Sequence, residues 1–171
     1  SEYSAPVRIT SNSVTIDNLE PGNTYYFKYF KCDDYGNSNK FIEFKKNTKP
    51  AKPQEVLATV SQTSNRKVTL SWKKGNNPNY KGADIAVRKY EPQTGSAPID
   101  GGQPTIQHIS AVENQDEYSY DFTNLDPGYR YRFTVSSYDS GDDFTTGYNS
   151  SVVVPADNSI GIVLPPDPPT N

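Results

Sequence analysis

Residues that commonly build reactive or metal-binding sites are scarce in this 171-residue chain. It has one cysteine (Cys32), one histidine (His108) and one tryptophan (Trp72), and it has no methionine, even at position 1. A single cysteine excludes an internal disulfide framework and a cysteine-rich metal site. A Ser-His-Asp arrangement would need a pocket and an oriented base around His108, and nothing in the sequence indicates either. We therefore expect no catalytic residue, no cofactor and no enzyme activity, with His108 at a surface or strand edge and Cys32 as a small, buried or half-buried filler.

Long apolar runs and an excess of basic residues are also missing. The 17 Lys and Arg against 20 Asp and Glu give a net charge of −3, so no broad basic field is available to hold nucleic acid or an anionic membrane. No apolar run approaches the ~20 residues needed to cross a bilayer. The sequence thus predicts neither nucleic-acid binding nor membrane insertion.

Tyrosine, proline and period-two alternation are what the chain has in abundance, with 13 Tyr and 14 Pro. In Tyr131-Arg132-Phe133-Thr134-Val135 the apolar and polar residues alternate, which is typical of a half-buried strand. The same signal predicts strands at 25–31, 56–60, 68–72, 85–90, 118–122 and 151–154. The spacing of Gly and Pro between them indicates about seven strands between Pro53 and Pro155, as in a β-sandwich.

A short phrase occurs twice. Asn18-Leu19-Glu20-Pro21-Gly22 returns as Asn124-Leu125-Asp126-Pro127-Gly128, and in both cases a tyrosine follows three residues later. The shift is constant (124 − 18 = 106), which matches a small domain used more than once. Because only about 50 residues precede a Pro-bearing linker, we expect residues 1–49 to be the C-terminal part of one module. Residues 50–156 would then be a complete module, and 157–171 a Pro-rich linker or the start of a further module.

These residues resemble the fibronectin type III family. Leu19, Pro21 and Tyr25, and again Leu125, Pro127 and Tyr131, have the family's spacing for a tyrosine corner, in which the ring packs in the core and the hydroxyl bonds the backbone. Trp72 matches the family's buried tryptophan. The resemblance implies an all-β fold of tandem Ig-like β-sandwiches, the first incomplete. It also implies a structural core of Trp72, Leu125, Pro127, Tyr131, Phe133, Leu19, Pro21, Tyr25 and Phe27.

The function that the resemblance implies is non-catalytic. Segment 79–98 is similar to modules of bacterial surface proteins and bacteriophage structural proteins, and the chain has no Arg-Gly-Asp. Such modules are spacers and interaction surfaces in larger extracellular, cell-surface or virion proteins, and they contact protein partners or neighbouring modules. The alternative is an accessory or carbohydrate-binding module of a secreted polysaccharide-degrading enzyme or an adhesin.

Two kinds of candidate binding residue remain beside this reading. Tyr80, Tyr90 and Tyr148 could form a contact surface for protein or cell-surface carbohydrate, or they could simply cover sandwich edges. Acidic residues fall at equivalent turns of the two units, Asp33 and Asp34 in the first and Asp139, Asp142 and Asp143 in the second. They could bind calcium or bond their own turn backbone, and the spacing matches no known calcium loop.

The missing half of the first module leads to a further expectation. If no segment preceded residue 1, the absent strands would have to come from another polypeptide, as in donor-strand assembly. Without them Tyr25, Phe27 and Tyr29 would face water.

Overall fold

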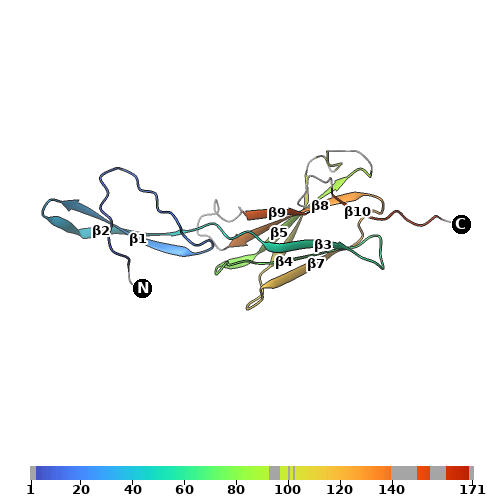
Figure 1. Ribbon diagram of the computed structural model, residues 1–171, viewed down its shortest axis with the longest axis horizontal. Helices are drawn as coiled ribbons and strands as arrows, with labels where there is room; N and C mark the ends of the chain where they lie inside the picture. The colour runs from blue at the N-terminus through green and yellow to red at the C-terminus, as the bar shows by residue number, and fades with distance from the viewer. Residues whose placement is uncertain are drawn as a thin grey trace.

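The computed structural model describes residues 3–92, 97–99, 101, 103–139, 150–154 and 161–169. It consists of two parts that lie end to end along the long axis, as Figure 1 shows. We call residues 3–49 the hairpin unit, residues 50–53 the linker, and the part formed by the remaining strands the sandwich. Every regular element in the described part of the chain is a β-strand, and that part holds no helix able to cross a bilayer.

The hairpin unit contains two long antiparallel strands, β1 (Thr24–Asp33) and β2 (Gly36–Asn47). Phe27 lies opposite Phe44 with their rings stacked at 5.2 Å. The end of β1 carries Cys32, which is exposed. The expectation that Cys32 is a buried or half-buried filler was wrong, because no second sheet in the described part of the chain covers this end of the hairpin.

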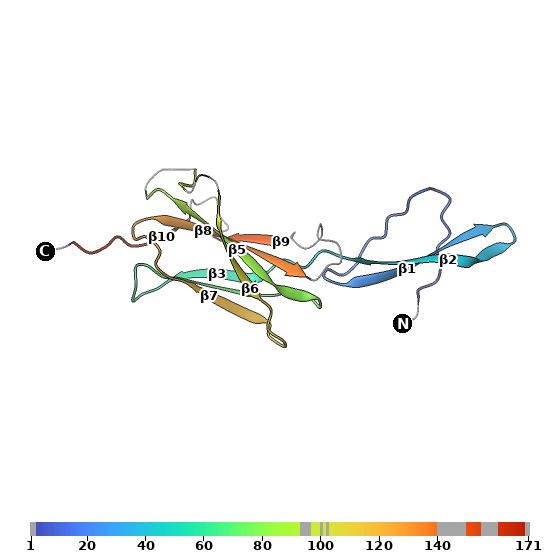
Figure 2. The same ribbon diagram turned by 180° about the vertical axis from the view of Figure 1, so that it is seen from behind.

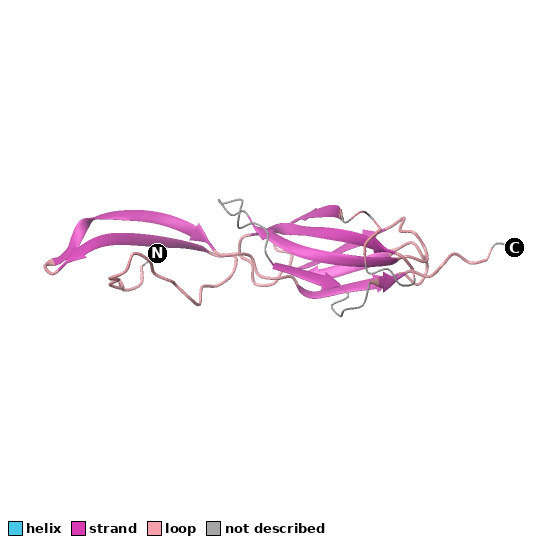
Figure 3. Ribbon diagram, turned by 90° about the horizontal axis from the view of Figure 1, so that it is seen from above, coloured by secondary structure: helices cyan, strands magenta, loops and turns pink. Residues whose placement is uncertain are grey.

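The sandwich has two antiparallel sheets that face each other (Figures 2 and 3). The first contains β3 (Gln54–Val60), β4 (Val68–Lys73) and β7 (Glu117–Phe122), in that order. The second has the order β10-β8-β5-β6, with β9 also pairing with β8. Its strands are β5 (Tyr80–Tyr90), β6 (Thr105–Ser110), β8 (Arg130–Asp139), β9 (Ser150–Val154) and β10 (Ile162–Val163). Seven strands from β3 to β9 confirm the sequence-based count, and the all-β sandwich is the expected fold.

The core of the sandwich follows from the alternation in its strands. In β4 and β8 every second residue is buried, and Phe133 is fully buried. Trp72 is 2% exposed and stacks on Tyr118 at 5.8 Å between ring centroids. Alternating residues point to opposite faces of a sheet, so each strand offers one apolar row to the layer between the sheets.

The C-terminal segment contributes to the same core. Ile162 and Val163 pair with Tyr131 and Arg130 of β8, and Leu164 is fully buried. These residues belong to the sandwich, so its sheet extends beyond the expected boundary at 156. The sequence shows this short apolar run but not the sheet with which it pairs.

Candidate functional site: the junction between hairpin unit and sandwich

The repeated phrase forms the same corner in both parts. Its asparagine has a positive φ, 58° at both Asn18 and Asn124, and its glycine does too, 65° at Gly22 and 78° at Gly128. Asparagine and glycine are the residues that adopt this left-handed region most readily. The phrase is therefore repeated because the backbone path is repeated.

A tyrosine hydroxyl closes each corner. The backbone N–H of Glu20 donates to the hydroxyl of Tyr25 at 2.8 Å, and the N–H of Asp126 donates to the hydroxyl of Tyr131 at 2.8 Å. Tyr131 is 4% exposed, whereas Tyr25 is half-buried. Burial raises the pKa of the Tyr131 phenol above its ordinary value.

A loop of the sandwich closes over the linker. We call residues 75–79, between β4 and β5, the junction loop. Asn77 in this loop is 2% exposed, and its amide Nδ2 donates to the carbonyl of Ala51 at 3.1 Å and to that of Lys74 at 2.7 Å. Its Oδ1 accepts a hydrogen bond from the N–H of Ala51. The Asn77 side chain thus binds both backbone groups of one linker residue, which fixes the linker in an extended path against the sandwich.

The same loop reaches the corner of the hairpin unit. Asn79 Nδ2 donates to the carbonyl of Gly22 at 2.8 Å and lies 3.4 Å from Thr24 Oγ1. A Cβ at Gly22 would lie 2.7 Å from Asn77 Oδ1 and 3.2 Å from Asn77 Cα. Only glycine leaves room for Asn77 at this distance. The contact between the sandwich and the hairpin unit therefore depends on Gly22.

Buried prolines complete the junction. Pro50 and Pro53 of the linker are both buried, Pro50 among the fully buried side chains. Proline has a fixed φ and needs no hydrogen-bond partner at its nitrogen, so it suits a packed, extended connection. Each hydrogen bond of the buried Asn77 amide contributes about 0.5–1.5 kcal/mol to stability. The junction is therefore a specific interface rather than a flexible tether.

The residues expected in the core occupy two different environments. Those of the complete part that lie on strands are buried: Trp72, Tyr131 and Phe133. At the corner of the sandwich, Leu125 and Pro127 are half-buried. In the hairpin unit all four expected core residues are half-buried: Leu19, Pro21, Tyr25 and Phe27. Among the described residues no sheet faces the hairpin unit, so its corner and strand residues keep contact with water.

Two of the three tyrosines that were candidates for a contact surface, Tyr80 and Tyr90, are buried. Tyr80 is 8% exposed and accepts a hydrogen bond from Trp72 Nε1 at 3.2 Å, and Tyr90 is 5% exposed. Strand β5 begins earlier than expected, which brings Tyr80 into the core, and Tyr90 forms an isolated antiparallel bridge with Pro98. Both rings are thus unavailable to a partner, and Tyr148 lies outside the described residues.

The acidic residues that were candidate calcium ligands lie in different environments. Asp33 accepts a hydrogen bond from the N–H of Tyr35 at 2.9 Å, the turn contact that was the alternative to calcium binding. Asp139 is buried, while Asp142 and Asp143 lie outside the described residues. Among the residues described, no group of three or more His, Cys, Asp or Glu is placed to hold a metal ion.

A polar cluster that the sequence did not reveal lies on the outer face of the second sheet. His108 Nδ1 is 2.6 Å from Asp84 Oδ1, and His108 Nε2 is 2.7 Å from the hydroxyl of Tyr138. The three residues come from β6, β5 and β8, so only the strand register brings them together. His108 lies on the edge strand and is 53% exposed. An oriented imidazole on an open face links three strands, but it offers no enclosed place for a substrate.

Comparison with known proteins decides the family. The fibronectin type III domain profile matches residues 51–152, which is more than half of the chain. The chain belongs to the fibronectin type III family. Domains of this family are generally non-catalytic modules that contact other proteins. No curated protein matches the chain in sequence.

The chain is also similar to solved structures of low sequence identity, and the one with a TM-score of 0.50 shares the fold. A segment of two fibronectin type III domains from chicken tenascin has a TM-score of 0.50 and 17% identity, and the match covers 80% of this chain and 65% of that one. Domains d3 and d4 of the extracellular region of rat CD45 give 0.44 and 17%, covering 90% and 73%. A structure described as a myokine gives 0.42 and 14%, covering 68% and 98%.

Proposed function

We propose that the chain is a rigid spacer from an array of fibronectin type III modules. Its modules hold their neighbours at a fixed distance and orientation in a larger protein outside the cell or on a virion, and they meet partners through loops and sheet edges. The observation that carries the proposal is the junction, where Asn77 is buried on the linker backbone. A flexible tether would not need a buried amide or two buried prolines.

We further propose that residues 1–49 are the C-terminal part of another module of this kind. Three features support this: the matching corner, the matching hydrogen bond to a tyrosine hydroxyl, and an apolar face that no sheet of the described residues covers. On that face Tyr29, Ile42 and Phe44 are 49%, 63% and 47% exposed. The match to the two-domain tenascin segment covers 80% of this chain, whereas the profile match covers only residues 51–152. The structural match therefore extends beyond the single complete module.

The source of the missing strands can be determined by the intact mass of the polypeptide in its native source. A mass far above 19.0 kDa would place these residues in a longer array that supplies the strands itself. A mass near 19.0 kDa would require another polypeptide to supply them, and assembly would then be the leading function.

Rigidity of the junction can be tested with a pair of matched substitutions. Gly22→Ala adds a Cβ that collides with Asn77 and also strains a backbone with φ of +65°. Gly128→Ala adds the same strain at φ of +78°, but its Cβ would lie 3.9 Å from the nearest described atoms, those of Pro166. Residual dipolar couplings should fit one alignment tensor across hairpin unit and sandwich in the unmodified chain. We expect Gly22→Ala to remove the shared tensor and Gly128→Ala to retain it.

A second pair of substitutions distinguishes the contribution of the Asn77 amide from that of the rest of the junction loop. Asn77→Ala removes the contacts to Ala51 and should also separate the two tensors, whereas Asn76→Ala alters an exposed neighbour and should not. Independent motion of the two parts in the unmodified chain would refute the spacer proposal.

A further inference from the structure

The C-terminal segment repeats the path that leads into the junction. In the hairpin unit Lys46 pairs with Tyr25, and in the sandwich Ile162 pairs with Tyr131, the equivalent tyrosine. The next backbone bonds match as well. Thr48 N–H donates to Asn23 O at 2.9 Å and Gly22 N–H to Lys49 O at 2.8 Å; Leu164 N–H donates to Tyr129 O at 3.0 Å, and Gly128 N–H is shared between Pro165 O at 3.2 Å and Leu164 O at 3.1 Å. The corner repeats at a shift of 131 − 25 = 106 and this segment at 162 − 46 = 116, so the sandwich has ten more residues between the two.

This register aligns the prolines of the two segments. Pro50 and Pro53 of the linker correspond to Pro166 and Pro169 at the shift of 116. The first two are buried under the junction loop, and the second two are exposed. The same Pro-x-x-Pro path therefore occurs before and after the sandwich. The sandwich covers the first copy, and the second copy is exposed.

The corner glycine shows the same difference. A Cβ at Gly22 would meet Asn77 at 2.7 Å, but among the described residues nothing lies closer than 3.9 Å to a Cβ at Gly128. The position that the asparagine of the junction loop occupies at the first corner is thus open at the second.

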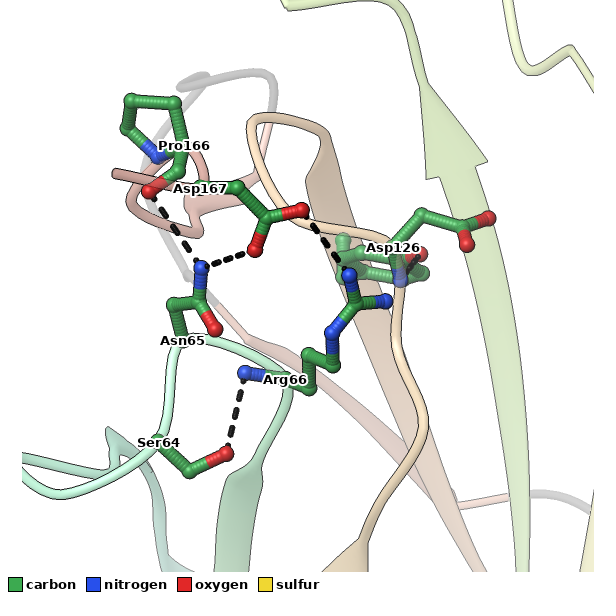
Figure 4. Close-up of polar contacts among 7 residues, drawn as sticks. Ser64, Asn65, Arg66, Asp126, Pro166 and Asp167 are labelled. Carbon is green, nitrogen blue, oxygen red and sulfur yellow. Dashed lines mark hydrogen bonds and ion pairs between the residues drawn. The ribbon is translucent and has the colours of Figure 1, made fainter. Parts of the chain in front are cut away.

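The uncovered segment is nevertheless held in place. Asn65 Nδ2 donates to Asp167 Oδ1 at 2.8 Å and to the Pro166 carbonyl at 3.3 Å, and Arg66 Nη2 lies 2.9 Å from Asp167 Oδ2 (Figure 4). These contacts tie the segment to the turn between β3 and β4. Exposed ion pairs stabilise little, about 0–1 kcal/mol, but a segment that is already extended loses less entropy when a partner docks on it.

We propose that Gly128 and residues 165–169 form a receiving surface for a further module of this same kind, joined in tandem. The junction loop of that module places an asparagine amide on the backbone of Asp167, as Asn77 does on Ala51. The proposal rests on the rigid-spacer function and adds a specific partner chemistry to it: a fibronectin type III module with a buried asparagine between its β4 and β5 strands.

The experiment extends the chain in the inferred register. Residues 1–169 are followed directly by a second copy of residues 54–169, so that Pro169 precedes Gln54 as Pro53 does in the natural chain. Residual dipolar couplings are then fitted for each module separately and for both together. We expect one tensor to fit both modules, and we expect Asn77→Ala in the appended copy alone to remove that shared fit. Gly128→Ala, which we expect to leave the shared tensor of the natural chain intact, should now remove it too.

Folding is controlled within the same data, because couplings inside each module must still fit one tensor after every substitution. An appended copy that moves independently while the first junction stays rigid would overturn this inference and leave the spacer function intact. A shared tensor that neither substitution disturbs would also overturn it, since other contacts would then hold the modules. Loose motion at both junctions would overturn the inference and the spacer function together.

Discussion

The hairpin unit and the sandwich carry the same corner but differ in how the side chains around it are buried. Both have Asn at φ of 58°, a left-handed glycine and a tyrosine hydroxyl 2.8 Å from a backbone N–H. Yet Phe133 of the sandwich is fully buried, and the equivalent Phe27 of the hairpin unit is only half-buried. The corner is thus a local structure set by its own residues, while burial depends on a facing sheet.

The largest expected effect comes from deleting the equivalent phenylalanines. Phe133→Ala should lower the free energy of unfolding by about 3–5 kcal/mol, because it leaves a cavity in a closed core. Phe27→Ala should cost about 1 kcal/mol, since its ring is already in part in water and water can enter the space. Urea unfolding followed by Trp72 fluorescence reports the first, and hydrogen exchange across β1 and β2 the second. Equal losses at the two sites would show that a cover for the hairpin exists in solution.

Alkaline pH should weaken the sandwich through its buried phenols. Burial raises the pKa of Tyr80 to about 12, whereas tyrosine in an unfolded chain ionises near pH 10. The unfolded state therefore loses this proton first, and the stability contributed by Tyr80 is full below pH 10 and lost as pH rises towards 12. Unfolding curves at pH 9 to 12 should show this decline. Tyr80→Phe should reduce the pH-dependent part of it, and Tyr35→Phe, at a fully exposed ring, should leave it unchanged.

The tyrosine hydroxyls give a smaller effect that separates local from global stability. Tyr131→Phe removes the acceptor of the Asp126 N–H and should lower the unfolding free energy by about 1 kcal/mol. Tyr25→Phe removes the acceptor of the Glu20 N–H in a half-exposed corner, and its loss should be smaller because water can replace the hydroxyl. Hydrogen exchange of these two amides measures both. A larger loss of protection at Glu20 than at Asp126 would contradict this account.

Alternation and the corner phrase were sufficient to predict the sandwich, most of its strands and the burial of Trp72, but not β2, β6 or β10. Both signals are local, because a strand shows its buried face within a few residues. The junction could not be predicted in this way. Asn77 reads as an ordinary turn residue beside Gly75 and Pro78, and its role depends on the linker residue Ala51, which is 26 positions away. The burial of Tyr80 could not be predicted for a related reason: a register shift between Tyr80 and Gly82 interrupts the alternation that would otherwise indicate it.

The smallest effect is expected where the two parts are most alike. Glycine adopts a φ of 58° without strain, so Asn18→Gly and Asn124→Gly should each change local stability by less than about 0.5 kcal/mol. Alanine at the same positions should cost about 1 kcal/mol, because a Cβ disfavours the left-handed region. The decisive quantity is the difference between the two parts, measured as the protection of the Glu20 and Asp126 amides. If the corner is local, glycine and alanine will act alike at both positions although one corner is on a closed sandwich and the other on an open hairpin. Unequal effects would mean that the facing sheet helps to hold even the backbone of the corner.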